Sequence, residues 1–292
     1  MDQFDQTQNF LFDNHPVRGT IVRLQDAYQT VIGQHPYPPL LQRLLGEAMV
    51  GAVLLAGMTK HPGKFTLQFQ GEGALKLLSV RTTHDLKIRG IAKWEGRLDS
   101  EASLATALGK GILAFTYELE AQSERYQSVV AVSGHSIAEA LENYFAQSEQ
   151  CATRLIFAST DCVAAGLLLQ TLPADEDRRQ RSFEHTVHLA DTLKPAELLQ
   201  LDYTALLHRL YHQETLRLFE ARAVKFACSC TIPRMENALL IMGRKEVMEI
   251  LTHHATVEVT CEFCNRKYEF DQAEVERLFV RNKISEAPKT IH

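Results

Sequence analysis

The sequence lacks the features of membrane and secreted proteins. Its longest apolar run, Ala48–Met58, has 11 residues, whereas a helix that crosses a bilayer needs about 20. Residues 1–16 are polar and acidic, without the basic and apolar regions of a signal peptide. We therefore expect a cytoplasmic protein with no membrane partner, in which the apolar run forms a buried core helix.

The sequence also has no excess of positive charge. It contains 31 Lys and Arg against 36 Asp and Glu, a net charge of −5, and no segment forms a basic block. This balance gives no electrostatic reason to expect nucleic acid as a partner. With 45% apolar and 23% charged residues, the chain has the composition of a globular protein with a sizeable core, which excludes global disorder.

No catalytic motif stands out either. GEG at 71–73 lacks the Lys-Ser/Thr of a phosphate loop, and SGHS at 133–136 is not a G-x-S-x-G elbow. Two histidine pairs have helical spacing but no Glu in the H-E-x-x-H position, so we interpret them as structural. We expect a protein that is not an enzyme. The paired histidines are His185 with His188 and His208 with His212.

The order of predicted elements indicates an α+β fold. A helix with apolar residues every three or four positions is predicted from Pro39 to about Met58, and a second over Ile137–Ala146, with Ser136 as its N-cap. Turn residues separate short strand-like runs, which favours a largely antiparallel sheet. The predicted strands are 17–24, 65–70, 75–80, 86–92, 112–118, 126–132, 155–157 and 166–172.

The composition divides the chain into three predicted domains. Residues 1–173 form an N-terminal α/β core domain with the sheet and packed helices. Residues 174–227 begin with the charged run ADEDRRQR and form a charged helical linker, with a small helical subdomain as the alternative. Residues 228–292 contain four of the six cysteines and form a small C-terminal zinc domain.

The strongest chemical signal is C-S-C at 228–230 and C-E-F-C at 261–264, separated by the 30 residues 231–260. Four thiolates suit a closed, tetrahedral Zn²⁺ site. C-x-C places two side chains on one side of an extended segment, and Asn265 after C-x-x-C tolerates the left-handed backbone of a tight turn. We predict one Zn²⁺ held in the reduced state; four buried reduced cysteines are the alternative. The predicted ligands are Cys228, Cys230, Cys261 and Cys264.

The same cysteines suggest redox chemistry. A metal holds sulfur as thiolate, the nucleophilic form, and each oxidised sulfur has a resolving partner nearby. Lys225, Arg266 and Lys267 either offset the negative charge of the four thiolates or belong to a solvated face. Of the other two cysteines, Cys162 is predicted to be a small core residue and Cys151 to be partly exposed.

The chain resembles the 33 kDa heat-shock protein family of bacteria over about residues 16–270. The C-x-C and C-x-x-C combination at this separation is the family's most specific mark. Asn265 departs from the Gly that many members have there, and Cys151 and Cys162 lie outside the family motif. The matching segments are PVRG at 16–19, YP at 37–38, QGEG at 70–73, ERYQSVV at 124–130, YFAQSEQ at 144–150, AAGLLLQTLP at 164–173, LLHRLYHQE at 206–214, CSC at 228–230 and CEFCNRKYEF at 261–270.

The resemblance implies a redox-regulated holdase chaperone that binds unfolding proteins under oxidative stress. Such members are inactive when reduced and zinc-bound. Oxidants form two disulfides, here Cys228–Cys230 and Cys261–Cys264, and release zinc. The linker and zinc domain then unfold and expose apolar surface to clients. Activated members form homodimers and pass clients to ATP-dependent foldase chaperones.

Two other functions remain as alternatives. A constitutive zinc-ribbon adaptor would keep its zinc in peroxide, and the near-neutral C-terminal segment argues against such an adaptor for nucleic acid. A thiol–disulfide oxidoreductase would need an exposed C-x-x-C at a helix N-terminus. The accompanying C-x-C pair argues against it.

Overall fold

The computed structural model describes residues 4–57, 62–119 and 125–286, with side chains to residue 282. The chain divides into two compact units, Met1–Ala227 and Cys228–His292. We call them the N-terminal unit and the C-terminal unit.

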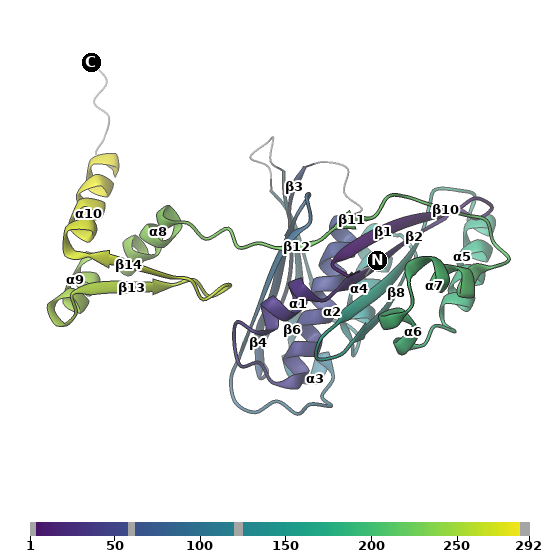
Figure 1. Ribbon diagram of the computed structural model, residues 1–292, viewed down its shortest axis with the longest axis horizontal. Helices are drawn as coiled ribbons and strands as arrows, with labels where there is room; N and C mark the ends of the chain where they lie inside the picture. The colour runs from purple at the N-terminus through teal and green to yellow at the C-terminus, as the bar shows by residue number, and fades with distance from the viewer. Residues whose placement is uncertain (1–3, 58–61, 120–124, 287–292) are drawn as a thin grey trace, which may run out of the picture. The chain divides into compact units, whose positions relative to one another are not determined.

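The predicted antiparallel pairing is confirmed, but the described strands of the N-terminal unit form two six-stranded sheets where one was predicted (Figure 1). The first sheet has the order β10-β1-β2-β9-β8, with β11 also paired to β1, and the second has the order β12-β5-β4-β3-β6-β7. Only the β12–β5 pair is parallel among these described strands. The first sheet comprises β1 (Gln6–Phe12), β2 (Val17–Leu24), β8 (Thr153–Ser159), β9 (Ala164–Thr171), β10 (Leu216–Leu218) and β11 (Arg222–Ala223). The second comprises β3 (Gly63–Gly71), β4 (Leu75–Thr83), β5 (Lys87–Trp94), β6 (Gly111–Leu119), β7 (Arg125–Ala131) and β12 (Lys225–Phe226).

The predicted core helix is confirmed as α2 (Pro39–Ala56), which lies between the two sheets and packs on both. Pro39 occupies its first turn, where the missing N–H costs little. By length and composition α2 could cross a membrane, but 78% of it is buried inside the protein. The predicted helix end at Met58 lies outside the described residues. The shorter helices of this unit are α1 (Asp26–Ile32), α3 (Leu104–Leu108), α4 (Ile137–Tyr144) and the π-helical segment η1 (Phe145–Glu149).

Three helices cover the other face of the first sheet: α5 (Glu176–Ala190), α6 (Pro195–Gln200) and α7 (Tyr203–Tyr211). Side chains alternate across a strand. Thus Leu168 of β9 packs into the α2 core, while Leu167 and Leu169 pack with α5–α7. This explains why all of β9 is buried. The larger apolar residues of α5–α7 are therefore docked on the first sheet.

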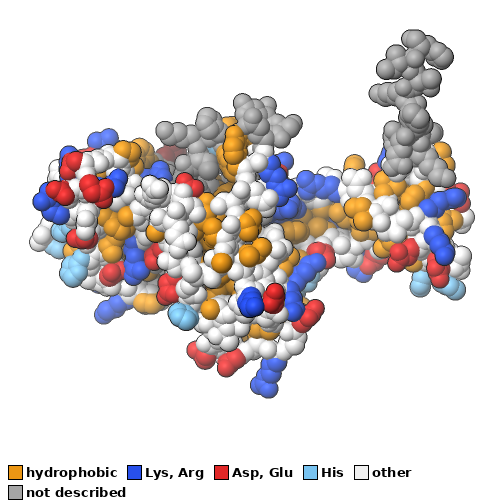
Figure 2. Space-filling view, turned by 180° about the vertical axis from the view of Figure 1, so that it is seen from behind, with side chains coloured by type: hydrophobic (Ala, Val, Ile, Leu, Met, Phe, Trp, Pro, Cys, Tyr) orange, Lys and Arg blue, Asp and Glu red, His pale blue; other side chains and the backbone are white. Residues whose placement is uncertain are grey.

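Helix α5 begins within the charged run of the predicted linker, because this run supplies its own N-terminus. The Asp175 carboxylate accepts a hydrogen bond from the Arg178 N–H at 2.9 Å, and Glu176 and Asp177 lie in the first turn. Acidic and basic side chains gather at the surface over this helix (Figure 2). Its buried residues, in contrast, are small: Ser182, Thr186 and Ala190.

The segment from β10 to β12 runs along the edges of both sheets. Strands β10 and β11 pair with β1 of the first sheet, and β12 pairs with β5 of the second. These strands are two or three residues long, so few backbone hydrogen bonds hold them. We call residues 216–226 the edge strap. It ends two residues before Cys228.

Strand β1 was missed by the sequence analysis because four of its seven residues are polar. Neighbouring residues pair with two of these polar side chains: the Thr20 hydroxyl donates to the Asn9 side-chain oxygen at 2.8 Å, and the Gln8 amide donates to the Phe219 carbonyl at 2.9 Å. Pairing on both sides thus outweighs the weak apolar alternation of the segment.

The C-terminal unit has a small core of its own. Seven buried apolar residues line it: Leu239, Val247, Val257, Phe270, Val275, Leu278 and Phe279. Natural domains of this size often add disulfides or a metal to a core that supplies little free energy by itself. Its elements are α8 (Ile232–Met242), α9 (Arg244–His253), β13 (Thr256–Thr260), β14 (Lys267–Asp271) and α10 (Gln272–Glu286).

A buried carboxyl group on α2 makes the stability of the N-terminal unit depend on pH. Burial raises the pKa of Glu47 from 4.5 to about 7, although Arg43, 3.8 Å away, opposes the shift. The folded state therefore binds an extra proton between these two values, so its stability falls as the pH rises from 4.5 to 7.

We expect Glu47→Gln to remove this dependence. The gain of the variant in free energy of unfolding over wild type should be roughly 2 kcal/mol larger at pH 8 than at pH 5. Urea unfolding followed by Trp94 fluorescence measures it, because Trp94 is the single tryptophan and lies in this unit. Exposed Glu101 provides the matched control, Glu101→Gln. Equal pH dependence in wild type and Glu47→Gln would contradict the assignment.

Candidate metal centre

Cys261 and Cys264 lie in the tight turn that joins β13 to β14. The Cys261 N–H donates to the Arg266 carbonyl at 2.9 Å, and the Cys261 carbonyl accepts from the N–H groups of Cys264 and Asn265 at 3.3 and 2.8 Å. Asn265 has φ 51°, the left-handed conformation predicted for it. Asn265 thus adopts the left-handed backbone conformation that glycine adopts most readily.

Cys228 and Cys230 lie in the irregular segment between β12 and α8. The Arg234 guanidinium, from the first turn of α8, donates to the carbonyl and the hydroxyl of Ser229 at 2.9 and 2.6 Å. This clamp fixes the residue between the two cysteines and so limits where their sulfur atoms point. The sequence analysis missed Arg234, because no spacing rule connects it to the C-x-C pair.

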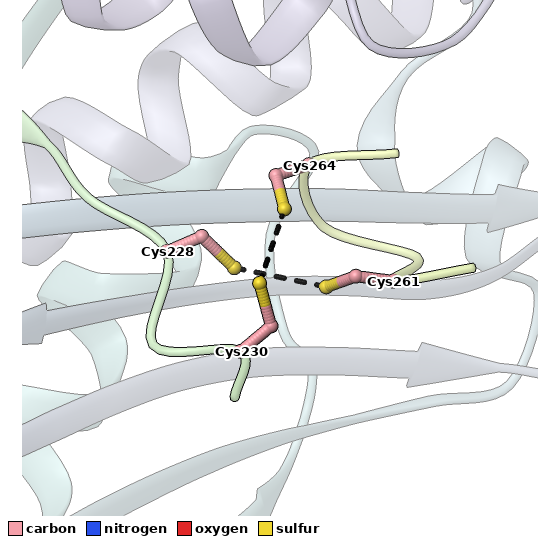
Figure 3. Close-up of side chains that lie close together, drawn as sticks. All are labelled: Cys228, Cys230, Cys261 and Cys264. Atoms are coloured by element: carbon pink, nitrogen blue, oxygen red, sulfur yellow. Dashed lines mark hydrogen bonds between the residues drawn. The ribbon is translucent and has the colours of Figure 1, made fainter. Parts of the chain in front are cut away.

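The four sulfur atoms converge, as Figure 3 shows. All lie within 4.8 Å of one another, with Cys228 Sγ 3.7 Å from Cys261 Sγ and Cys230 Sγ 3.4 Å from Cys264 Sγ. A tetrahedral site with metal–sulfur bonds of about 2.3 Å has sulfur–sulfur edges of about 3.8 Å. The described geometry fits this, and the four cysteines, none of them in a disulfide, can hold a metal ion.

Burial keeps two of these thiols, those of Cys261 and Cys264, protonated when no cation is near. It raises the pKa of Cys261 and raises that of Cys264 to about 12, with hydrogen bonds from neighbouring cysteines adding to the shift at Cys264. A divalent cation reverses this preference because it stabilises thiolates directly. The cluster is therefore a poor set of nucleophiles by itself and a good set of metal ligands.

Polar and charged side chains lie around the four sulfur atoms. The Tyr268 hydroxyl donates to Cys230 Sγ at 3.2 Å. The pKa of Arg266 is raised first by a hydrogen bond with Tyr268 and then by the charges of the nearby cysteines. Lys267 instead pairs with Glu258 at 3.0 Å. Of Lys225, Arg266 and Lys267, it is thus Arg266 that lies close to the sulfur atoms in the described part of the C-terminal unit.

The two remaining cysteines differ in their surroundings. Cys151 is partly exposed, as predicted, with its sulfur 3.6 Å from the Thr171 carbonyl. The prediction that Cys162 is a core residue is wrong, because its side chain is exposed. It lies in the turn before β9, where the Thr160 hydroxyl accepts a hydrogen bond from its N–H at 3.2 Å.

The glycines of the QGEG segment have a packing role. A Cβ atom at Gly71 would lie 2.3 Å from the Leu108 carbonyl oxygen, and one at Gly73 would lie 2.5 Å from that of Ala107. Only glycine lets β3 approach the end of α3 this closely.

Comparison with known proteins identifies relatives over nearly the whole chain. The Hsp33 protein family matches residues 5–271. A 33 kDa chaperonin of Shewanella sp. (strain ANA-3) is 43% identical over 94% of this chain and 96% of its own length. One from Pseudomonas aeruginosa (strain LESB58) is 41% identical over 96% of each chain. The crystal structure of a 33 kDa chaperonin from Thermotoga maritima superposes with a TM-score of 0.83 and 25% identity, covering 97% of this chain and 100% of that one.

Proposed function

Since this chain belongs to the Hsp33 family, we propose that it is a cytoplasmic holdase chaperone whose activity is controlled by oxidation of a zinc–thiolate centre. The observation that carries the proposal is the convergence of four cysteine sulfur atoms in a unit with a small core. One Zn²⁺ held by these sulfurs would supply much of the stability of that unit.

The switch consists of a change in sulfur chemistry. Oxidation forms Cys228–Cys230 and Cys261–Cys264. The four thiolates release four electrons as the two disulfides form, and two molecules of peroxide accept these electrons with four protons from solvent and are reduced to water. All four sulfur ligands are lost together, so the metal leaves. Strained disulfides across short spacings are readily reduced, which makes the step reversible.

Loss of the metal would turn residues 228–292 from a folded zinc domain into an unfolded segment, and residues 174–227 from a docked linker into a client-binding segment. Residues 1–173 would remain as the stable core. The linker carries apolar side chains that are now buried or half-buried on the first sheet, and their exposure would create a surface for unfolding proteins. These side chains are Leu189, Leu193, Leu198, Leu199, Leu206, Leu207 and Leu210.

The partners follow from this mechanism. Clients are unfolded or partly unfolded proteins, bound through apolar contacts during oxidative stress. The exposed surface also favours a homodimer of the oxidised protein, and reduction would return clients to ATP-dependent foldases. We propose that the protein binds clients and catalyses no reaction, and that neither nucleic acid nor a membrane is its partner.

Two measurements test the proposal together: zinc content and suppression of client aggregation, each before and after peroxide treatment with mild heat. We expect one zinc per chain and little suppression before oxidation, then zinc release and strong suppression after it. Zinc retained in peroxide would instead support a constitutive adaptor. Turnover of disulfide substrates would support an oxidoreductase, although C-x-x-C lies here in a turn between strands.

We expect Tyr268→Phe to weaken zinc binding by about 10-fold, the lower end of the range for groups that hydrogen-bond to metal ligands. The change removes the hydroxyl that donates to Cys230 Sγ and keeps the ring. Competition with a chromophoric zinc chelator measures the affinity. Arg277→Ala, at an exposed position of α10, is the matched control. Unchanged zinc affinity in Tyr268→Phe would show that this hydrogen bond does not support the centre.

A further inference from the structure

A second group of potential metal ligands, which contains no cysteine, lies in the N-terminal unit. His15, His185 and Glu214 place their imidazole nitrogen and carboxylate oxygen atoms within 4.8 Å of one another. Glu214 lies at the centre: its Oε2 is 3.1 Å from His15 Nε2, and its Oε1 is 2.8 Å from His185 Nε2. The two imidazole rings are 5.2 Å apart, centroid to centroid.

Backbone pairing holds His15 and Glu214 in place. His15 lies in the turn between β1 and β2, and Glu214 lies two residues before β10. The Asp13 N–H donates to the Thr215 carbonyl at 3.0 Å, next to the paired residues of β1 and β10. The His15 ring also packs edge-on against buried Phe12, with centroids 6.0 Å apart. The two side chains therefore meet without any rearrangement of the backbone.

His185 is fixed from the side of helix α5. Its neighbour Thr186 is fully buried, and the Thr186 carbonyl accepts a hydrogen bond from the Tyr211 hydroxyl at 3.3 Å. Tyr211 is itself buried three residues before Glu214. Three elements that are distant in sequence thus present their side chains to one point from anchored positions.

We propose that His15, His185 and Glu214 form a second metal site, which binds a zinc-class divalent cation with water in the remaining position. Two imidazoles and one carboxylate are a ligand set that zinc uses where a coordination position stays open. Exposure supports the open position, since the side chain of His185 is 47% exposed while that of Glu214 is 12% exposed. Figure 2 shows histidine side chains at the surface at the end of the unit where α5–α7 lie.

The charges around the site permit a cation. Arg217 is neutralised by Asp13 at 2.9 Å, and Arg178 points to the Asn14 carbonyl at 3.5 Å. A bound ion would connect α5 and the segment after α7 to the turn between β1 and β2. It would therefore oppose detachment of these helices from the first sheet. The site needs no cysteine, so its occupancy does not depend on the proposed redox centre.

The test is a titration of the reduced, zinc-loaded full chain with additional Zn²⁺, followed by calorimetry. We expect a second zinc per chain, bound more weakly than the first. His185→Ala and Glu214→Gln are each expected to weaken this second binding by at least about 10-fold. The added zinc should also slow hydrogen exchange in α5 of the wild type and not in these variants.

A matched control comes from His208 of α7 and His212, the C-cap residue of this helix, which are both exposed and have ring centroids 6.3 Å apart. His208→Ala should keep the second zinc. His185→Asn keeps a polar side chain at this exposed position and guards against an effect of misfolding. No second zinc in the wild type would overturn the proposal, as would second-zinc binding that survives in both His185 variants or is lost in His208→Ala.

Discussion

Peroxide treatment with mild heat is expected to abolish hydrogen-exchange protection from about residue 174 to the C-terminus, while residues before 174 keep theirs. The C-terminal unit should lose protection first, because seven buried apolar residues form its core. Without a metal, a core of this size supplies too little free energy to offset the conformational entropy of the chain.

The edge strap is the next element expected to open. Its strands β10, β11 and β12 are two or three residues long, and the chain continues from Phe226 through Ala227 into the C-x-C pair. Once Cys228 and Cys230 no longer bind a metal, the end of the strap is tethered to an unfolded segment. Short strands with few hydrogen bonds then separate from β1 and β5 at little cost.

Helices α5 and α7 should respond differently because they bury different side chains. Helix α5 fully buries only small residues and packs its larger apolar ones, Phe183, Val187 and Leu189, partly against the first sheet, so its detachment exposes less apolar area than that of α7. Helix α7 buries large ones, and fully burying each such side chain is worth about 1.5–3 kcal/mol. We therefore expect release of α7 to limit activation and to expose the most apolar surface to clients. The buried residues of α7 are Tyr203, Leu206, Leu207, Leu210 and Tyr211.

Hydrogen exchange of peptides from reduced and oxidised protein measures these steps, and Trp94 fluorescence reports separately on the core of the N-terminal unit. Cys162→Ser is the matched control, since this exposed cysteine lies outside the cluster and its loss should leave the response unchanged. Equal loss of protection before and after residue 174 would indicate global unfolding. Protection retained in α7 of a protein that suppresses aggregation would place the client surface elsewhere.

The sequence was most informative where chemistry fixes spacing. Four cysteines in two short motifs predict a cluster because four thiolates together suit a metal ion. The left-handed backbone of Asn265 is predictable because few residues other than glycine adopt positive φ. Long apolar helices such as α2 are predictable for a similar reason, since burial requires their periodicity.

Features that depend on distant parts of the chain were not predictable. Polar β1 is a strand because β2 and β10 pair with it. The division of the strands into two sheets follows from α2 lying between them, which no local pattern encodes. The exposure of Cys162 was not predictable either. The apolar stretch beside it suggested burial, but a turn exposes its side chain.

Replacing Cys264 with serine is expected to give a chaperone that is partly active without any oxidant. The site would keep three sulfur ligands and gain a weak oxygen ligand, so the loss of zinc affinity should exceed the roughly 10- to 100-fold typical of changes outside the ligand shell. Under the proposed link between metal binding and folding of the C-terminal unit, a fraction of the molecules would unfold there under reducing conditions.

The substitution tests the metal without the disulfides. Serine leaves the Cys264 backbone free to make its hydrogen bond to Cys261, so the turn itself is not the target. Limited proteolysis should cut within residues 228–292 of the reduced variant and leave the N-terminal unit whole, and aggregation assays should show activity between those of reduced and oxidised wild type. Cys151→Ser, which changes a cysteine outside the cluster, should match wild type in both assays. If Cys264→Ser keeps wild-type protection of residues 228–292, then zinc does not hold this unit together, and oxidation must activate the protein by another route.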